Sequence, residues 1–382
     1  MLVFYGTQCY NSNGKRICAE CDLVSCLFAR ESVFIKGLKS TMKKFRVAVI
    51  GCGNISVMHF ASIAMTESCE LVACCDIKEE RARKWAEKYG VVYYTDYNEM
   101  FDKEALDAVH LCLPHYIHSK VSIEAMERGI NVLCEKPMDV SYEAAELAVK
   151  RAEELGVQFG IISQCRYHDS SRFVKERISS GKLGKIISVA SSLTWVRHDD
   201  YYKSSDWKGT WDKEGGGVII NQAIHTLDLV RWIVDSEAKE ISCSMSNRAH
   251  PSVEVEDSSE GLITFENGVR YGFWCMNNYG INENIEIRIH CERGEVRLGY
   301  NDAYITYSDG TKEEAHNQEE EECCGLGMDY WGIKHVRQIR QYYSALAGCE
   351  ELEISGREAL KTHKMIMDIY DSAGMKSAFL KK

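Results

Sequence analysis

Short apolar runs alternate with amphipathic stretches over residues 42–164. The runs predict five strands, at residues 46–50, 70–75, 108–113, 130–134 and 157–163. The stretches between them predict helices after residue 56 and over residues 79–89, 117–128 and 141–155. Strands that alternate with helices are typical of a parallel, doubly wound sheet, in which ligands bind at the carboxyl ends of the strands.

The pattern changes near residue 185, where helices become rare. Six apolar runs predict strands at residues 186–193, 239–246, 259–265, 269–275, 284–291 and 294–298. Glu266-Asn267-Gly268 predicts a tight hairpin turn, and two closing helices are predicted over 330–347 and 356–373. We therefore expect an α/β Rossmann domain over residues 42–164. An α+β substrate-binding domain with a large, mainly antiparallel, open-faced sheet should follow over residues 165–382.

Residues 1–41 lack a clear strand or helix period and contain four cysteines. Cys18 and Cys21 have the spacing of half a zinc site, but no second pair lies at zinc-ribbon spacing. Met42 directly precedes the first clean strand. We interpret residues 1–41 as a leader that is non-native or disordered, with Met42 as the functional start.

Composition excludes several classes of protein. The 382 residues contain no apolar run of 18 or more, which argues against a membrane-spanning helix. The net charge of −11 and the lack of a basic block argue against nucleic acid as a partner. The 17 cysteines are scattered and odd in number, which favours a reducing, cytoplasmic setting over a disulfide scaffold.

A glycine-rich turn follows the first strand, with the sequence Gly51-Cys52-Gly53-Asn54-Ile55-Ser56. Gly51 permits the tight turn, and Gly53 lets the backbone approach a pyrophosphate at the helix N-terminus. Asp76 ends the second strand, about 20 residues on, where a carboxylate accepts ribose hydroxyls and repels a 2′-phosphate. This arrangement favours NAD over NADP. The alternative for Asp76 is an N-cap of the helix over 79–89.

Further candidate residues follow other predicted strands. Pro114-His115 and Glu135-Lys136-Pro137 stand at strand ends, and we expect a cis bond before Pro137. Three glycines at 215–217 lead into a buried helix on which Asn221, His225 and Asp228 share one face. Buried polar groups need partners or a function, although His225 taken alone favours a core histidine bonded to a carbonyl.

Together these segments resemble the Gfo/Idh/MocA oxidoreductase family over roughly residues 43–380. The resemblance rests on GCGNIS at 51–56, Asp76, LPHYIH at 113–118, EKP at 135–137 and GGGVIINQAIHTLD at 215–228. The stretch from Trp195 to Thr210 further resembles a subgroup that acts on sugars, glycosides or nucleotide sugars, often at ring C3. Asn221 stands where the family often has Asp, and His115 stands where Asn is common.

The resemblance implies roles for individual residues in the oxidation of a secondary hydroxyl. We expect His225 to act as the base, Lys136 to stabilise the developing alkoxide and Asn221 to orient the hydroxyl, with Lys136 as the alternative base. The expected cofactor-binding residues are Gly51, Gly53, Asn54, Ile55, Asp76, Pro114, His115, His118, Glu135 and Lys136. The expected substrate-binding residues are Arg166, Arg197, Tyr202, Trp207, Lys208 and Gln222.

Two other functions stay open at this point. A transient 3-keto sugar would permit elimination, as in NAD-dependent glycosidases, and a non-catalytic dinucleotide sensor would need no turnover. We expect no metal, because His59, His118 and His335 lack metal-ligand spacing. A homodimer or homotetramer through the C-terminal sheet is expected.

Overall fold

The computed structural model describes residues 3–5, 8–10, 16–18, 44–318 and 334–375. Residues Met1–Lys44 and Phe45–Lys382 form two separate units. In the first unit, β1 (Val3–Tyr5), β2 (Gln8–Tyr10) and β3 (Arg16–Cys18) form an antiparallel sheet, for which the sequence pattern gave no indication. Cys21, one of the two cysteines with the spacing of half a zinc site, lies outside the described residues.

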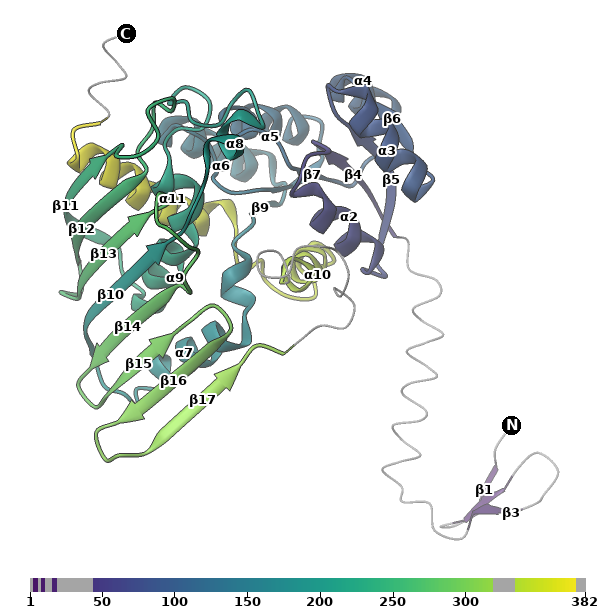
Figure 1. Cartoon of the computed structure of the whole chain (residues 1–382). Helices are drawn as coiled ribbons and strands as arrows, with labels where there is room; N and C mark the ends of the chain where they lie inside the picture. The colour runs from purple at the N-terminus through teal and green to yellow at the C-terminus, as the bar shows by residue number, and fades with distance from the viewer. Residues whose placement is uncertain (1–2, 6–7, 11–15, 19–43, 319–333, 376–382) are drawn as a thin grey trace. The chain divides into compact units, whose positions relative to one another are not determined.

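The second unit begins with a six-stranded sheet whose strands are all parallel (Figure 1). The strand order is β6-β5-β4-β7-β8-β9. The chain therefore starts at the centre of the sheet, adds β5 and β6 on one side of β4, and then adds β7, β8 and β9 on the other side. This reversal of order between β4 and β7 is the switch point at which doubly wound sheets bind ligands. The strands are β4 (Phe45–Ile50), β5 (Cys69–Cys75), β6 (Val92–Tyr94), β7 (Ala108–Leu111), β8 (Asn131–Cys134) and β9 (Phe159–Ile161).

Helices cover both faces of this sheet, because its central strands are buried on both sides. Tyr342 and Tyr343 of the C-terminal helix α10 (His335–Leu346) join the core on the α2 side, so α10 packs back onto the first half of the unit. The helices that belong to the sheet are α2 (Ser56–Ala64), α3 (Glu79–Tyr89), α4 (Tyr97–Lys103), α5 (His118–Met126) and α6 (Tyr142–Leu155).

An eight-stranded sheet follows, in the order β11-β12-β13-β10-β14-β15-β16-β17. All neighbouring strands are antiparallel except β10 and β13, so the expected fold class is confirmed. The strands are β10 (Ile186–Thr194), β11 (Ala238–Ser246), β12 (Ser258–Phe265), β13 (Arg270–Met276), β14 (Glu286–Cys291), β15 (Gly294–Leu298), β16 (Asp302–Tyr307) and β17 (Lys312–His316).

One face of this sheet packs on helices (Figure 1). Leu227 of α9 (Ile224–Val234) and Ile366 of α11 (Gly356–Ser372) share a core with Tyr271 and Ile289 of the strands. The helices α7 (Asp169–Ser179) and α8 (Asp199–Lys203) complete this half. Among the helices of residues 44–318 and 334–375, none is both long and apolar enough to cross a membrane.

The sequence pattern missed some short or polar elements. β6 has three residues at a sheet edge, which is too short for a recognisable period. β17 reads Lys-Glu-Glu-Ala-His and lies at the edge of its sheet, where charged residues are common because they discourage further pairing. β16, α4 and α7 were also not predicted.

Candidate active site

The glycine-rich turn adopts the conformation that the sequence predicts. Gly51 has a φ of 92°, and a Cβ at this position would lie 2.2 Å from the carbonyl oxygen of Cys112. Only glycine fits such a position. Gly53 has no heavy atom within 4 Å of its Cβ position, so its backbone is open to approach by a phosphate. Asn54 is exposed, and Ile55 precedes the first turn of α2.

Asp76 connects the glycine-rich turn to the end of β5. Its Oδ2 accepts a hydrogen bond from the Cys52 amide at 2.8 Å, and its Oδ1 accepts one from the Lys78 amide at 2.8 Å. The N-cap of α3 is Lys78, so the alternative role of Asp76 as that cap is not observed. Each carboxylate oxygen retains a lone pair for a ribose hydroxyl. The turn and Asp76 together fit a dinucleotide.

The two histidines of the LPHYIH segment, His115 and His118, are more buried than a cofactor contact suggests. Pro114 precedes a short 3₁₀ turn, His115–Ile117. His115 Nδ1 lies 2.7 Å from the Glu214 carbonyl oxygen, and burial lowers the pKa of His115 well below its usual value. His118 is fully buried, with its ring nitrogens 2.7 Å and 2.8 Å from the carbonyl oxygens of Pro137 and Leu113. His118 therefore ties two strand ends together.

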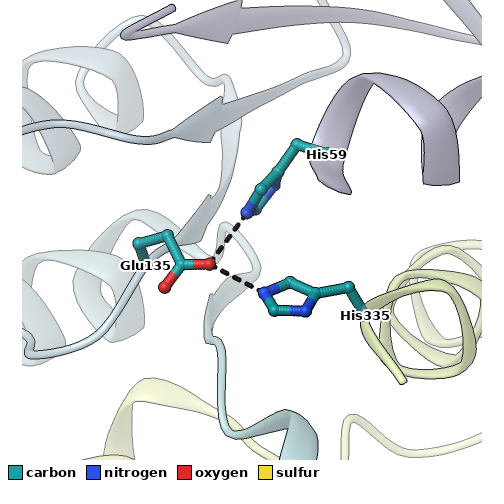
Figure 2. Close-up of side chains that lie close together, drawn as sticks. All are labelled: His59, Glu135 and His335. Atoms are coloured by element: carbon teal, nitrogen blue, oxygen red, sulfur yellow. Dashed lines mark hydrogen bonds and ion pairs between the residues drawn. The ribbon is translucent and has the colours of Figure 1, made fainter. Parts of the chain in front are cut away.

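Glu135 ends β8 and faces a closed group of histidines (Figure 2). Its Oε1 lies 3.0 Å from His59 Nε2 and 2.9 Å from His335 Nε2. His59 Nδ1 lies 2.9 Å from His110 Nδ1, and His110 Nε2 lies 2.8 Å from the Tyr343 hydroxyl. These bonds form one chain of compatible donors and acceptors that ends on the carboxylate.

The charge of Glu135 is stabilised inside this group. Hydrogen bonds and ion pairs with the two histidines hold the pKa of Glu135 well below its usual value, although burial opposes them. Its second oxygen accepts from the Lys136 amide at 3.2 Å. Glu135 was expected to bind the cofactor; its Oε1 is bonded to two histidines in the interior of the protein, and a cofactor contact stays a prediction.

His59, Glu135 and His335 place three possible metal-ligand atoms within 4.8 Å of one another. The expectation of no metal rested on sequence spacing, and that argument fails because folding brings His59 and His335 together across 276 positions of the chain. The nitrogens that face Glu135 serve here as hydrogen-bond donors. The absence of a metal site stays a prediction.

Lys136 points away from Glu135 toward the helix that follows the three glycines. Its Nζ donates to the Asn221 backbone oxygen at 2.8 Å and to the Asn221 Oδ1 at 3.3 Å. Burial lowers the pKa of Lys136, while Glu135 and Glu214 raise it. The bond between Lys136 and Pro137 is cis, as expected. Lys136 and Asn221 are thus direct partners, which the sequence motif alone did not establish.

Asn221 lies in a π-helical turn, Ile219–Ala223, that runs directly into α9. π-helical turns are rare and are frequent at functional sites. The three preceding glycines permit close packing, since a Cβ on Gly216 would lie 2.0 Å from the Tyr370 hydroxyl. The sequence analysis assumed regular α-helical spacing here, and the π turn is a difference from that expectation.

Glu214 is the functional candidate that sequence reasoning missed. It is 1 % exposed and lies just before the three glycines. Its Oε1 accepts from Asn221 Nδ2 at 2.5 Å, and its Oε2 accepts from the Gly209 amide at 2.5 Å. Burial raises the pKa of Glu214 to about 7, although both hydrogen bonds and the nearby Lys208 lower it. An acidic residue next to a glycine run was the available signal.

His225 follows Asn221 by one turn, and the pKa of its imidazole is strongly lowered. Burial and the positive charge of Lys136 lower the pKa of His225 to about 3, so the ring is neutral near pH 7. Its ring has no hydrogen-bond partner within the part of the chain that the structure describes.

Tyr201, and not the expected Tyr202, faces the catalytic candidates. The Tyr201 hydroxyl accepts from Asn221 Nδ2 at 3.0 Å and from Gln222 Nε2 at 3.4 Å. Tyr202 is buried, and its hydroxyl accepts from Asn277 Nδ2. Gln222 is also buried, and its Oε1 accepts from Asn277 Nδ2. The Gln222 amide therefore links Asn277 to the Tyr201 hydroxyl.

Arg166 and Asp228 belong to a buried ion pair outside this group. The guanidinium of Arg166 bonds both carboxylate oxygens of Asp228 at 2.7 Å and 2.5 Å, and Arg166 is 3 % exposed. Glu358 and Thr362 of α11 complete the pair. Arg166 was expected to bind substrate; the structure instead places it where it joins α9 to α11.

Three further expected substrate residues gather near Lys136. Arg197 lies over the Tyr201 ring at 5.4 Å, and Lys208 lies over the same ring at 3.8 Å. Trp207 packs beside His115, with ring centroids 4.7 Å apart. Burial lowers the pKa of Lys208, and the charges of Arg197 and Lys136 lower it further, while Glu214 raises it. Three cations therefore surround one small region.

Comparison with known proteins agrees with this geometry. Residues 45–163 match "Oxidoreductase family, NAD-binding Rossmann fold", and residues 171–297 match "GFO/IDH/MocA C-terminal domain". The chain belongs to the GFO/IDH/MocA oxidoreductase family. It is an oxidoreductase with an NAD-binding Rossmann domain, as expected from the resemblance.

Individual relatives are distant. The chain is 29 % identical to "D-glucoside 3-dehydrogenase" of Escherichia coli over 63 % of this chain and 72 % of that protein. It is 28 % identical to "2,7-anhydro-N-acetylneuraminate hydratase" of Mediterraneibacter gnavus, over 58 % of each chain. Among solved structures, the WlbA dehydrogenase of Bordetella pertussis, in complex with NADH and UDP-GlcNAcA, superposes with a TM-score of 0.75 at 28 % identity. The match covers 87 % of this chain and 97 % of that one.

Proposed function

We propose that this protein is an NAD-dependent dehydrogenase that oxidises a secondary hydroxyl, at ring C3, of a sugar that carries an acidic group. The observation that carries the proposal is the placement of Lys136. Its Nζ is held by Asn221 at the end of β8, and its charge acts on the neutral imidazole of His225. Bound NAD supplies the hydride acceptor.

The protein's own residues then have distinct tasks. Neutral His225 accepts the proton of the hydroxyl, and its unbonded ring is free for that contact. The ammonium of Lys136 stabilises the alkoxide that develops, because a cation in a water-poor site acts strongly. Asn221 orients Lys136. Lys136 as the base is the alternative, since burial already lowers its pKa.

An acidic substrate is favoured by the surplus of positive charge. Lys136, Arg197 and Lys208 act on one another in this region. A carboxylate or phosphate bound there would offset their repulsion and would raise the pKa of His225 toward neutral pH, where a base works best. The name of the WlbA complex, which contains UDP-GlcNAcA, supports the same class.

A matched panel of sugars tests this proposal. Purified protein with NAD is offered glucose, glucuronate, glucose 6-phosphate, a methyl glucoside and UDP-linked sugars with and without a uronate. We expect NADH absorbance to increase with the acidic members and only weakly with their neutral partners. Sugar release or isomerisation without net NADH would instead support transient oxidation with elimination or hydration. NADH binding with no turnover on any member would support the sensor.

We also propose that the protein forms a homodimer through the open face of its second sheet. Ile187, Leu262 and Trp274 are 47 %, 62 % and 43 % exposed on three strands of that sheet. Apolar groups gathered on one sheet face are typical of an interface. Light scattering at micromolar concentration tests this, and a monomer mass under those conditions would contradict it.

A further inference from the structure

We propose that Glu214 is a positioning residue for the proposed reaction: in its ionised form it fixes the Asn221 amide so that the amide oxygen faces Lys136. The inference rests on the proposed role of Lys136. Glu214 belongs to none of the sequence motifs described above. Its protonation would make the orientation of the Asn221 amide depend on pH, independently of His225.

The first step of the argument is the position of Asn221 between two charged groups. Its Nδ2 lies 2.5 Å from Glu214 Oε1, and its Oδ1 lies 3.3 Å from Lys136 Nζ. An ammonium only donates hydrogen bonds, and an ionised carboxylate only accepts them. The two neighbours therefore demand the same orientation of the amide, with nitrogen toward Glu214 and oxygen toward Lys136.

The second step concerns a protonated Glu214. Both of its recorded contacts, the Gly209 amide and Asn221 Nδ2, are donors. A proton on either carboxyl oxygen of Glu214 would point at a hydrogen-bond donor and would find no acceptor. Rotation of the Asn221 amide by 180° supplies one, because Oδ1 then faces Glu214. The same rotation turns Nδ2 toward Lys136, which keeps only the Asn221 backbone oxygen at 2.8 Å.

The third step is that the two protonation states are close in free energy. Glu214 is nearly fully buried, which favours the neutral acid, while its two donors and Lys208 favour the carboxylate. The groups whose charge reaches it come from several elements: Lys136, Tyr201, Tyr202, Lys208, Glu256 and Tyr370. His115 contacts only its backbone oxygen.

Glu256 provides a matched control within the same fold. It is buried and its pKa is also raised to about 7 by burial. Its carboxylate accepts from the amides of Gly217 and Ile219 and from the Tyr370 hydroxyl. Glu256 has no bond to Asn221 or Lys136 in the described chain. A titration at Glu256 should therefore shift the midpoint of the Glu214 step through its charge, without turning the Asn221 amide.

The test observes the Asn221 side chain directly, so it requires no substrate. Protein labelled with ¹⁵N asparagine is titrated from pH 5 to pH 9, and the loss of one NH₂ pair in N221D assigns the resonance. We expect the wild-type pair to shift in one step with a midpoint near 7. In E214Q the step should vanish, and the pair should stay at the low-pH position, because glutamine resembles the protonated acid.

Two further variants identify the titrating group. The step should persist in E256Q, and it should persist in K136M, which removes the titration of Lys136 itself. A step that remains in E214Q, a step that is lost in K136M, or no step in wild-type protein would each overturn the inference. E214D, which keeps a carboxylate, should restore a step if E214Q does not fold.

Turnover adds a second readout where the sugar panel has given a substrate. At pH 8 we expect E214Q to lower kcat about tenfold with an unchanged dissociation constant for NADH, which is the scale of one hydrogen bond to a charged group. If no sugar is oxidised, the proposed function fails while the titration still decides the role of Glu214. An unchanged kcat beside a lost step would also overturn the positioning role.

Discussion

Glu135 and Lys136 are neighbours in the chain and have opposite surroundings. Glu135 is buried and bonded to His59 and His335, and these contacts lower its pKa. Lys136 is half-buried, and within the described chain its ammonium is bonded only to Asn221. On the closed side of this segment, Glu135 and its histidine partners form a buried network. On the presented side, Lys136 extends its ammonium toward Asn221. The comparison teaches that adjacent residues can have opposite environments: bonded partners enclose the Glu135 carboxylate, while the Lys136 ammonium extends toward Asn221.

The presented side should have the larger effect on turnover. K136M should lower kcat by at least ~10²-fold, because the alkoxide loses its cation. NADH binding, measured by fluorescence, should stay within about twofold, since the change removes no dinucleotide contact of the glycine-rich turn. The matched control is K120M, at a lysine whose side chain is 68 % exposed. Near-normal turnover in K136M would contradict the proposed role of the Lys136 charge in the reaction.

The closed side should have the larger effect on stability. H59L removes one donor to Glu135 and the acceptor of His110, so it should lower the free energy of unfolding by roughly 2 kcal/mol. Urea denaturation measures the loss. The control is H290L, on an exposed position of β14. Equal stability of the two variants would show that the network is dispensable.

Two buried carboxyl groups, Glu135 and Glu256, should differ in how they change stability with pH. Histidine partners lower the pKa of Glu135, whereas Glu256 has only neutral donors and its pKa is raised to about 7. A carboxyl with a raised pKa holds its proton in the folded state, so it lowers stability as pH increases from about 4.5 to about 7. E256Q should reduce that decline by roughly 3 kcal/mol, because one pKa unit corresponds to about 1.4 kcal/mol. An identical slope in E256Q and wild type, from urea midpoints, would contradict this.

The smallest expected effect concerns the far end of the cofactor. D76S removes the carboxylate at the end of β5, so it should lower the preference for NAD over NADP by roughly fivefold. Dissociation constants for the two reduced cofactors give the ratio. D102S, at an acid that is 72 % exposed, serves as the control. An unchanged ratio would remove Asp76 from cofactor selection.

Much of the fold followed from local pattern. The helix over 79–89 and the strand over 294–298 were predicted with the observed bounds, because their periods are regular. The cis bond before Pro137 and the role of Gly51 were also anticipated. Short edge strands were missed because three to five residues, or charged ones, carry no clear period.

The candidate site also contains residues that the sequence could indicate and residues that it could not. Lys136, Asn221 and His225 could be named as candidates because each follows a strand end or a glycine run, and the structure places Lys136 and Asn221 in contact. The choice of Tyr202 over Tyr201, and of Arg166 as a substrate residue, failed because adjacent or isolated residues give no sign of which side chain faces inward. Glu214 was overlooked because its importance depends on Asn221, seven positions later.

The sequence by itself determined the parallel sheet, the glycine-rich turn and the order of the reactive residues, because these depend on local period and backbone geometry. Only the tertiary structure decided which groups meet. His59 and His335 reach Glu135 from two distant helices, and Glu214 reaches Lys136 through Asn221. Charge and pKa follow from burial and from partners, and both are set by contacts between segments that lie far apart in the chain.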